Sequence, residues 1–273
     1  MGQTMQIASP TAKINASDCA ADLFACIDLG IVTPMANERE NAQEFVRQVF
    51  ARASRFSFRS IRHYCVFDNV CTDGTYEILI RLADELPHLV PVWAPENRCV
   101  VDAYLKGYHR ALTEQCHWIL EMDAGFSHRV EDMDVFFQAM AKGYDCVFGV
   151  RFGLSGSHFD GGFKRRFISR GGTFLSNLLL GTKLPDMTSG FEMFSHEALS
   201  SILSRGIQSR GPFFQTEIKA FAHQHRITVV PIRYNSPSHN VGGNALRDAF
   251  RTLWQLRKQL KKTQLHSSEE SRP

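Results

Sequence analysis

The 273-residue sequence lacks the features that mark several large classes of protein. It contains no run of the roughly 20 apolar residues that a membrane-spanning helix requires. It does not open with basic residues followed by an apolar stretch, so no secretory signal is visible. Its seven cysteines are odd in number and never have C-x-x-C spacing, which argues against a zinc site and for a reducing compartment. We therefore expect a cytoplasmic protein.

Charge of one sign is not in large excess either. The chain has 31 Lys and Arg against 28 Asp and Glu, for a net charge of +3, and we expect no nucleic-acid partner. Basic residues do gather near the C-terminus, where residues 244–262 have the spacing of an amphipathic helix with one strongly basic face. Such a helix either binds an anionic membrane surface or packs on the protein with its basic face in water. A membrane-embedded protein is a further candidate partner.

Most of the chain alternates short apolar runs with segments of helical periodicity. We predict strands over residues 27–33, 60–67, 89–93 and 145–151, and another strand at Trp118. A short strand follows the polar turn 186–191, and a last strand covers 226–234. We predict helices over residues 38–53, 76–86, 100–113, 130–142 and 214–223, and an apolar helix that follows the segment 163–172 and ends near residue 180. A Gly- and Ser-rich loop covers residues 153–162. This alternation predicts an α/β fold with a mostly parallel sheet.

Three regions follow from this pattern. We expect a loosely ordered leader over residues 1–24, one α/β domain over 25–240, and the basic helix and tail over 241–273. A dinucleotide-binding Rossmann fold is disfavoured, because the turn after the first strand has no G-x-G-x-x-G.

Asp123 is the central candidate for chemistry. It lies in the stretch 117–128, where a short apolar run that reads as a buried strand ends at this carboxylate, and a glycine, Gly125, comes two residues later. In open α/β sheets, ligands bind at the carboxyl ends of the strands, which is where this carboxylate is expected. The alternative is that Asp123 only caps a helix that begins near Val130.

Five segments in order resemble the family 2 inverting glycosyltransferases, most closely the dolichol- or polyprenol-phosphate mannosyltransferase branch. They are Val-Thr-Pro-Met-Ala-Asn-Glu (32–38), Val-Phe-Asp-Asn-Val-Cys-Thr-Asp-Gly-Thr (66–75), Glu-Met-Asp-Ala-Gly-Phe-Ser-His (121–128), Ile-Ser-Arg-Gly-Gly (168–172) and Asp-Met-Thr-Ser-Gly-Phe (186–191). The resemblance implies a GT-A fold and a nucleotide-sugar donor, either GDP-mannose or a UDP-hexose. It also implies a polyprenyl phosphate acceptor at the inner membrane surface.

The resemblance assigns donor-site residues by position. Residues expected to contact the nucleotide or the donor sugar are Pro34, Ala36, Glu38, Asp68, Asn69, Gln215 and Glu217. Asp68 also has a physical case, because a carboxylate at a strand end can accept hydrogen bonds from ribose hydroxyls or base N–H groups.

Asp123 matches the first acid of the family's Asp-x-Asp motif, which binds the donor diphosphate through Mg²⁺ or Mn²⁺. Gly125 stands in place of the second acid. A metal here would rest on Asp123, phosphate oxygens and water, with Ser127, His128 or Glu121 as further candidates, since Mg²⁺ commonly uses only one or two carboxylates.

Arg151 and Arg170 match the branch's acceptor-phosphate ligands, and guanidinium groups suit bidentate phosphate binding. Lys164, Arg165 and Arg166 could contact lipid headgroups. Two alternatives stay open. The acceptor could be a hydroxyl of a surface polysaccharide, which would need Asp186 or Glu217 as a general base. The chain could also be a degenerate nucleotide-sugar-binding subunit without activity.

Overall fold

A seven-stranded sheet forms the centre of the computed structural model, which describes residues 23–211, 213–235, 253, 256 and 257. The strand order is β3-β2-β1-β4-β7-β5-β8. Only β7 runs antiparallel to its neighbours, so the predicted mostly parallel sheet is confirmed. The strands are β1 (Asp28–Pro34), β2 (Ser60–Phe67), β3 (Leu89–Trp93), β4 (Trp118–Glu121), β5 (Cys146–Val150), β7 (Glu192–Ser195) and β8 (Ile227–Pro231).

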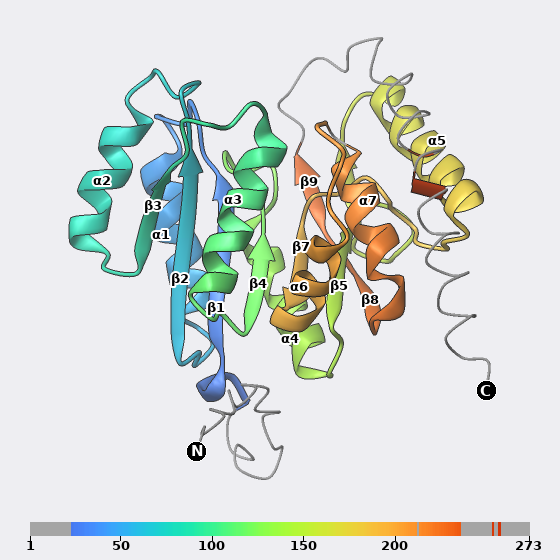
Figure 1. Ribbon diagram of the computed structural model, residues 1–273, viewed down its shortest axis with the longest axis horizontal. Helices are drawn as coiled ribbons and strands as arrows, with labels where there is room; N and C mark the ends of the chain where they lie inside the picture. The colour runs from blue at the N-terminus through green and yellow to red at the C-terminus, as the bar shows by residue number, and fades with distance from the viewer. Residues whose placement is uncertain (1–22, 212, 236–252, 254–255, 258–273) are drawn as a thin grey trace, which may run out of the picture.

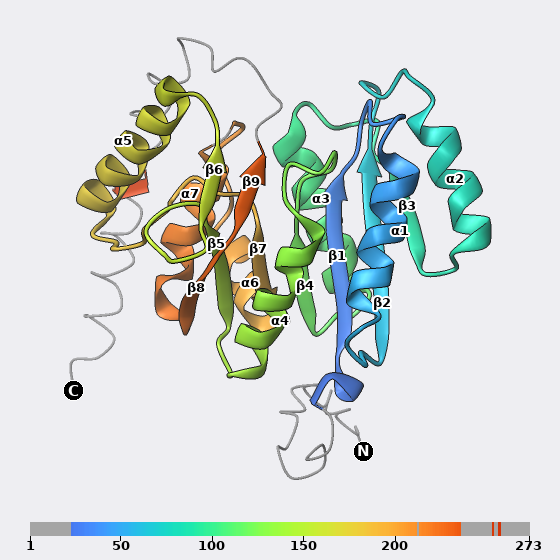
Figure 2. The same cartoon turned by 180° about the vertical axis from the view of Figure 1, so that it is seen from behind.

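Helices cover both faces of this sheet (Figures 1 and 2). One face carries α1 (Ala42–Ala53), α2 (Thr75–Glu85) and α4 (Met133–Ala141), and the other carries α3 (Val100–Thr113), α6 (His196–Ser204) and α7 (Phe214–Phe221). The long helix α5 (Phe163–Leu180) lies at the opposite end of the molecule from α2. The remaining elements are a two-stranded sheet of β6 (His158–Asp160) and β9 (Arg233–Asn235) and the short 3-10 helices Leu23–Cys26, Val130–Asp132 and Ala222–Gln224.

Burial on both faces explains the apolar character of the central strands. In β1, Leu29 and Ile31 pack into the core beneath α1 and α4, whereas Val32 packs into the core beneath α3. Parallel strands that are covered on both faces are expected to be apolar throughout. Helix α3 approaches β1 closely at Gly107, where an added Cβ would lie only 2.3 Å from Val32 Cγ1. The two elements can therefore pack at this distance only with glycine at residue 107.

The boundaries of two strands, 60–67 and 89–93, agree with the sequence prediction. The predicted last strand over 226–234 is instead two strands in different sheets, because the backbone leaves the large sheet after Pro231 and β9 pairs with β6. Helix α5 already begins at Phe163 and continues through Gly171 and Gly172, which the prediction had placed before the helix. Helix α6 was not predicted, although Ser195 caps it by accepting the Ala198 N–H.

Two expectations concern cysteines and membranes. Cys65, Cys71, Cys99, Cys116 and Cys146 are free thiols, whereas Cys26 is disulfide-bonded, which differs from what a reducing compartment predicts. Among the described residues, no helix combines the length and the apolar character needed to cross a membrane.

The expected leader and basic C-terminal helix lie largely outside the described residues. Of the predicted helix over 244–262, only Leu253, Leu256 and Arg257 are described, and the two leucines are buried.

Candidate active site

The carboxyl ends of β1, β2 and β4 bring three of the predicted segments to one edge of the sheet. Hydrogen bonds tie the loop after β1 to the loop after β2. The Asn37 Oδ1 accepts the Thr72 N–H at 2.9 Å, and the Glu38 N–H donates to the Thr75 hydroxyl at 2.8 Å. The first two resemblance segments therefore form one connected surface.

The residues predicted to bind the nucleotide line this surface. Pro34 ends β1, and Ala36 and Glu38 follow it, all partly accessible. Asp68 follows β2 and uses Oδ1 to accept the Val70 N–H at 3.0 Å, while the Asn69 amide donates to the Pro95 carbonyl at 2.9 Å. Asp68 and Asn69 therefore help to shape their own loop, and their contacts with a nucleotide stay a prediction.

Asp123 is held in place by two contacts that leave part of its carboxylate free. The buried Tyr104 hydroxyl on α3 donates to Asp123 Oδ1, and the Asp123 N–H donates to His128 Nδ1 at 3.1 Å. The Asp123 side chain is still 41% exposed. Gly125 and Phe126, at φ of 69° and 60°, form the turn between Asp123 and His128. No motif in the sequence indicated that Tyr104 would contact Asp123.

His128 supports this turn. Its ring is buried between Phe191 and Tyr234, with centroid distances of 4.9 and 5.1 Å. Burial lowers the pKa of His128 to about 4, so the ring is neutral at pH 7. Nδ1, the nitrogen nearer Asp123, already accepts a hydrogen bond, and assistance of a metal by His128 stays a prediction.

The residues around Asp123 fit a divalent cation that also binds a diphosphate. Within the described ranges, no three His, Cys, Asp or Glu side chains form a metal site on their own. A Cβ added at Gly125 would lie 2.8 Å from Glu38 Oε2 and 3.0 Å from Oε1, so the Glu38 carboxylate fills the space beside this glycine. Two carboxylates together with phosphate oxygens and water match the ligands that Mg²⁺ prefers.

A group of buried ionisable side chains lies next to the end of β4. Glu121 accepts a hydrogen bond from Gln215 Nε2 at 2.6 Å and lies opposite Glu192 in the antiparallel pairing. Lys219 on α7 pairs with Glu192 and donates to the Ser189 carbonyl at 2.7 Å. Burial and the nearby Glu192 raise the pKa of Glu121 well above its ordinary value. Gln215 on α7 thus contacts the last residue of β4, two residues before Asp123.

Glu217, the other acid of the predicted Gln-x-Glu pair, has a structural contact. It is fully buried, and its carboxylate accepts the N–H groups of Gln208 and Ser209 at 3.0 and 2.8 Å. These bonds anchor the loop before α7. Catalysis by Glu217 stays a prediction, and the geometry gives this carboxylate a backbone-binding role.

Arg151, at the end of β5, is buried against Asp186. Its Nε and Nη2 donate to the two Asp186 oxygens at 2.8 and 2.9 Å, and Nη2 also reaches the Thr188 hydroxyl at 2.6 Å. Burial raises the pKa of Asp186, but the Arg151 guanidinium outweighs it and holds that pKa down at about 2. Among the described residues, Nη1 of Arg151 has no hydrogen-bond partner.

Three arginines surround one cluster of aromatic rings, formed by Phe152, Phe159 and Tyr234. The Arg151 guanidinium lies 5.2 to 5.6 Å from all three ring centroids. Arg170 lies 5.1 Å from the Phe152 ring, and Arg165 lies 5.8 Å from the Tyr234 ring. The structure therefore brings Arg151 and Arg170 to the same ring and adds Arg165 to the cluster. Their binding of an acceptor phosphate stays a prediction.

Helix α5, which carries Arg165 and Arg170, turns an apolar stripe outward. Four large apolar residues of this helix are 67 to 86% exposed: Phe163, Phe167, Phe174 and Leu178. Along the sequence they follow one another at intervals of four, seven and four residues. A monomeric soluble protein rarely exposes several large apolar side chains in one contiguous row. This stripe is a candidate contact surface, and the sequence had suggested only that the helix is apolar.

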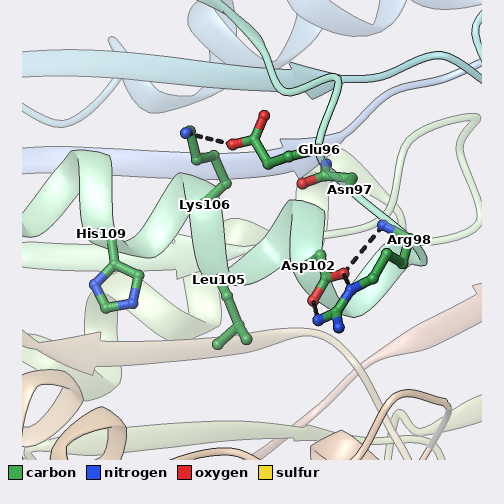
Figure 3. Close-up of a pocket in the computed structure, with 7 residues that line it drawn as sticks. All are labelled: Glu96, Asn97, Arg98, Asp102, Leu105, Lys106 and His109. Carbon is green, nitrogen blue, oxygen red and sulfur yellow. Dashed lines mark hydrogen bonds and ion pairs between the residues drawn. The ribbon is translucent and has the colours of Figure 1, made fainter.

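A separate surface pocket of about 370 Å³ lies on the outer side of α3 (Figure 3). Its charged residues already pair with one another, Lys106 with Glu96 and Arg98 with Asp102. It contains none of the predicted site residues, so we place the site at the sheet edge instead.

Comparison with known proteins identifies the family to which the chain is similar. The family model described as glycosyl transferase family 2 matches residues 30–203. Polyprenol monophosphomannose synthase from Mycolicibacterium smegmatis is 27% identical over 226 residues, which cover 81% of this chain and 83% of that protein. Undecaprenyl-phosphate mannosyltransferase from Micrococcus luteus is 28% identical over 171 residues, which cover 62% of this chain and 70% of that protein.

Solved structures show the same fold at low sequence identity. Glucosyl-3-phosphoglycerate synthase from Mycobacterium tuberculosis, crystallised with Mg²⁺ and uridine diphosphate, superposes with a TM-score of 0.59 at 14% identity. The match covers 85% of this chain and 80% of that chain.

Proposed function

We propose that this chain, which belongs to glycosyl transferase family 2, transfers a mannosyl group from a nucleotide sugar to a polyprenyl phosphate. It is a glycosyltransferase of GT-A fold. The names of the two relatives specify a polyprenol-linked mannose product in one case and undecaprenyl-phosphate mannosyl transfer in the other. GDP-mannose is therefore the first donor to test, and a UDP-hexose is the alternative.

The observation that carries this proposal is the place of the three arginines relative to Asp123. His128, which supports the Asp123 turn, lies 5.1 Å from Tyr234, and Tyr234 lies 5.5 Å from the Arg151 guanidinium. A diphosphate at Asp123 and an acceptor phosphate at Arg151 and Arg170 would then be neighbours across Tyr234. This is the arrangement that a direct displacement between two phosphate-bearing substrates needs.

The acceptor is a phosphate in this proposal because neither predicted general base is available. Asp186 is buried in its ion pair with Arg151, and Glu217 is occupied by two backbone N–H groups. A hydroxyl acceptor would require a base within hydrogen-bond reach. A phosphate, with a second pKa near 6, is already anionic at pH 7 and needs none.

In the reaction, an acceptor phosphate oxygen attacks the anomeric carbon on the face opposite the leaving group. The bond from that carbon to the diphosphate breaks, and its electron pair stays on the diphosphate oxygen, so the configuration inverts. A bound Mg²⁺ or Mn²⁺ would neutralise the charge that develops there. Asp123 holds that end of the site, while Arg151 and Arg170 orient the attacking phosphate.

We place the lipid acceptor at a membrane surface that contacts α5. The outward stripe of Phe163, Phe167, Phe174 and Leu178 is apolar, and Arg166 and Arg170 lie exposed on the same helix. Aromatic side chains next to arginines suit the boundary between acyl chains and anionic headgroups. An acceptor phosphate in that boundary would lie beside Arg170.

Transfer of radiolabel from GDP-mannose or UDP-hexoses into an organic-soluble product, with polyprenyl phosphate in detergent, tests the function. Arg170→Ala should reduce product formation strongly, whereas Arg81→Ala, an exposed arginine on α2, should not. Absence of organic-soluble product from every donor would contradict the proposal. Equal activity of Arg170→Ala and the wild type would show that Arg170 does not bind the acceptor phosphate.

A further inference from the structure

We propose that Glu38 supplies the second carboxylate of the metal–diphosphate site, in place of the acid that is missing at residue 125. The sequence had placed Glu38 at the base and ribose of the nucleotide. The new assignment rests on the proposed function, because it takes a nucleoside diphosphate as the ligand at Asp123. It explains how the sequence Asp-Ala-Gly can take the place of a motif that has two acids.

The geometry at Gly125 carries the assignment. An ideal Cβ at this residue would be 2.8 and 3.0 Å from the two Glu38 carboxylate oxygens, closer than real Cβ contacts allow. The Glu38 carboxylate therefore lies where a side chain at residue 125 would begin, two residues after Asp123. Gly125 also has a φ of 69°, which is unfavourable for most residues with a side chain. Glycine at 125 and glutamate at 38 thus fit together.

Backbone contacts hold Glu38 in this place. Its N–H donates to the Thr75 hydroxyl at 2.8 Å, and the next N–H, of Arg39, donates to Asp73 Oδ2 at 2.9 Å. Of its carboxylate oxygens, Oε2 accepts a long bond from Asn41 at 3.4 Å. No hydrogen bond reaches Oε1 from any described residue. One Glu38 oxygen is consequently available for a cation.

Asp123 is arranged in a complementary way. Tyr104 occupies Oδ1 of Asp123, and its buried hydroxyl fixes the orientation of the carboxylate. Oδ2 accepts no hydrogen bond from the residues that the structure describes. Each acid therefore presents one free oxygen, and phosphate oxygens and water can complete the coordination of Mg²⁺ or Mn²⁺.

The electrostatics agree with this geometry. The negative charges of Asp73 and Asp123 both act on the Glu38 carboxylate. Neighbouring carboxylates repel each other unless a proton or a cation lies between them. A divalent cation shared by Glu38 and Asp123 would remove this repulsion.

Mn²⁺ binding in the presence of excess GDP or UDP tests the assignment without any acceptor. The electron paramagnetic resonance signal of free Mn²⁺ gives its affinity for the protein–nucleotide complex. We expect Glu38→Gln to weaken Mn²⁺ binding by at least about tenfold, since loss of an outer-sphere partner alone costs that much. Glu40→Gln, which changes an exposed acid of the same loop, should bind Mn²⁺ like the wild type.

A double variant that moves the carboxylate from residue 38 to residue 125 makes the test specific. In Glu38→Ala/Gly125→Asp, the added side chain no longer meets Glu38, and aspartate tolerates the left-handed backbone better than most residues. We expect this double variant to recover much of the Mn²⁺ affinity that Glu38→Ala loses. Thermal unfolding of each variant confirms that the protein is folded.

Two outcomes would overturn the assignment. One is unchanged Mn²⁺ affinity in folded Glu38→Gln. The other is weaker nucleotide binding by the same factor with and without Mn²⁺, which would return Glu38 to the base and ribose. Failure of the transfer assay with polyprenyl phosphate would instead contradict the proposed function and leave the Mn²⁺ result unaffected.

Discussion

The two sides of the candidate site use opposite charges and different supports. The carboxylate side comprises Glu38, Asp68 and Asp123, which lie in short loops directly after β1, β2 and β4. The arginine side comprises Arg151, Arg165 and Arg170, which pack on the rings of Phe152, Phe159 and Tyr234. On the first side the strand ends place the acids, whereas on the second an aromatic cluster and α5 place two of the three cations.

This difference matches the two tasks that we propose. Loops tied to a rigid sheet suit a soluble donor whose leaving group must be held with little movement. A cationic surface beside an exposed apolar helix suits an acceptor that is part of a lipid layer. Arg151 joins the two sides, because it directly follows β5 of the sheet and also packs on the rings.

The ion pair of Arg151 and Asp186 should have the largest single effect on stability. Asp186→Asn leaves the buried guanidinium without its counter-charge, and loss of one partner of a buried pair costs about 3–5 kcal/mol. Urea unfolding measures the change. Glu85→Gln breaks the exposed pair with Arg47 and should cost less than about 1 kcal/mol. A loss below 1 kcal/mol in Asp186→Asn would show that the arginine side does not depend on this pair.

Asp123→Asn should have the next largest effect, and on catalysis instead of stability. The amide keeps the shape but cannot neutralise a cation, so we expect kcat/KM for transfer to fall by about 10²–10³. Asp84→Asn, on the exposed side of α2, is the matched control. If Asp123→Asn keeps full activity, the carboxylate side does not bind the leaving group, and the comparison of the two sides loses its chemical meaning.

The sequence predicted the strands that position the site better than the contacts between the site residues. Strands 60–67 and 89–93 were predicted to the residue because polar turns flank short apolar runs. The contact of Glu38 with Gly125 was not predicted, because it joins two loops through the order of strands β1 and β4 in the sheet. Local patterns carry no information about such pairs.

The arginine side was harder to predict for a second reason. An apolar helix in a sequence is expected to pack inward, and only the folded chain shows that Phe167 and Phe174 face outward. In the same way, Asp186 and Glu217 were candidate bases by residue type, and their burial with hydrogen-bond partners became evident only in three dimensions. Burial depends on the whole fold and is not encoded in a motif.

The pH dependence of stability tests the surroundings of His128, which lies between the Asp123 turn and the Tyr234 ring. The pKa of His128 is lowered by burial from an ordinary value of 6.5 to about 4. The unfolded chain therefore binds the proton first as the pH falls, and the contribution of His128 to stability is present above pH 6.5 and lost as the pH falls to about 4. The loss amounts to at most about 3 kcal/mol.

Urea unfolding of the wild type and His128→Gln between pH 4 and 7.5 isolates this contribution as a difference curve. The subtraction is needed because other groups titrate in the same range, including the buried His63, whose pKa burial lowers to about 3. Parallel stability curves for the two proteins would mean that the ring is not neutral and buried as described.

The smallest expected effect is on α5, and it separates the two sides most cleanly. Phe167→Glu/Phe174→Glu changes two residues that are each 70% exposed, so folding stability should stay within about 0.5 kcal/mol per substitution. Binding to vesicles with anionic lipid should weaken by about tenfold or more, because apolar contact is lost and negative charge is added.

The control is Ile80→Glu, which changes an exposed apolar residue on α2, at the opposite end of the molecule (Figure 1), and should leave vesicle binding unchanged. Mn²⁺ and nucleotide binding should be normal in both variants, since the carboxylate side is untouched. Equal vesicle binding by all three proteins would remove α5 from the arginine side and leave its apolar stripe to another partner.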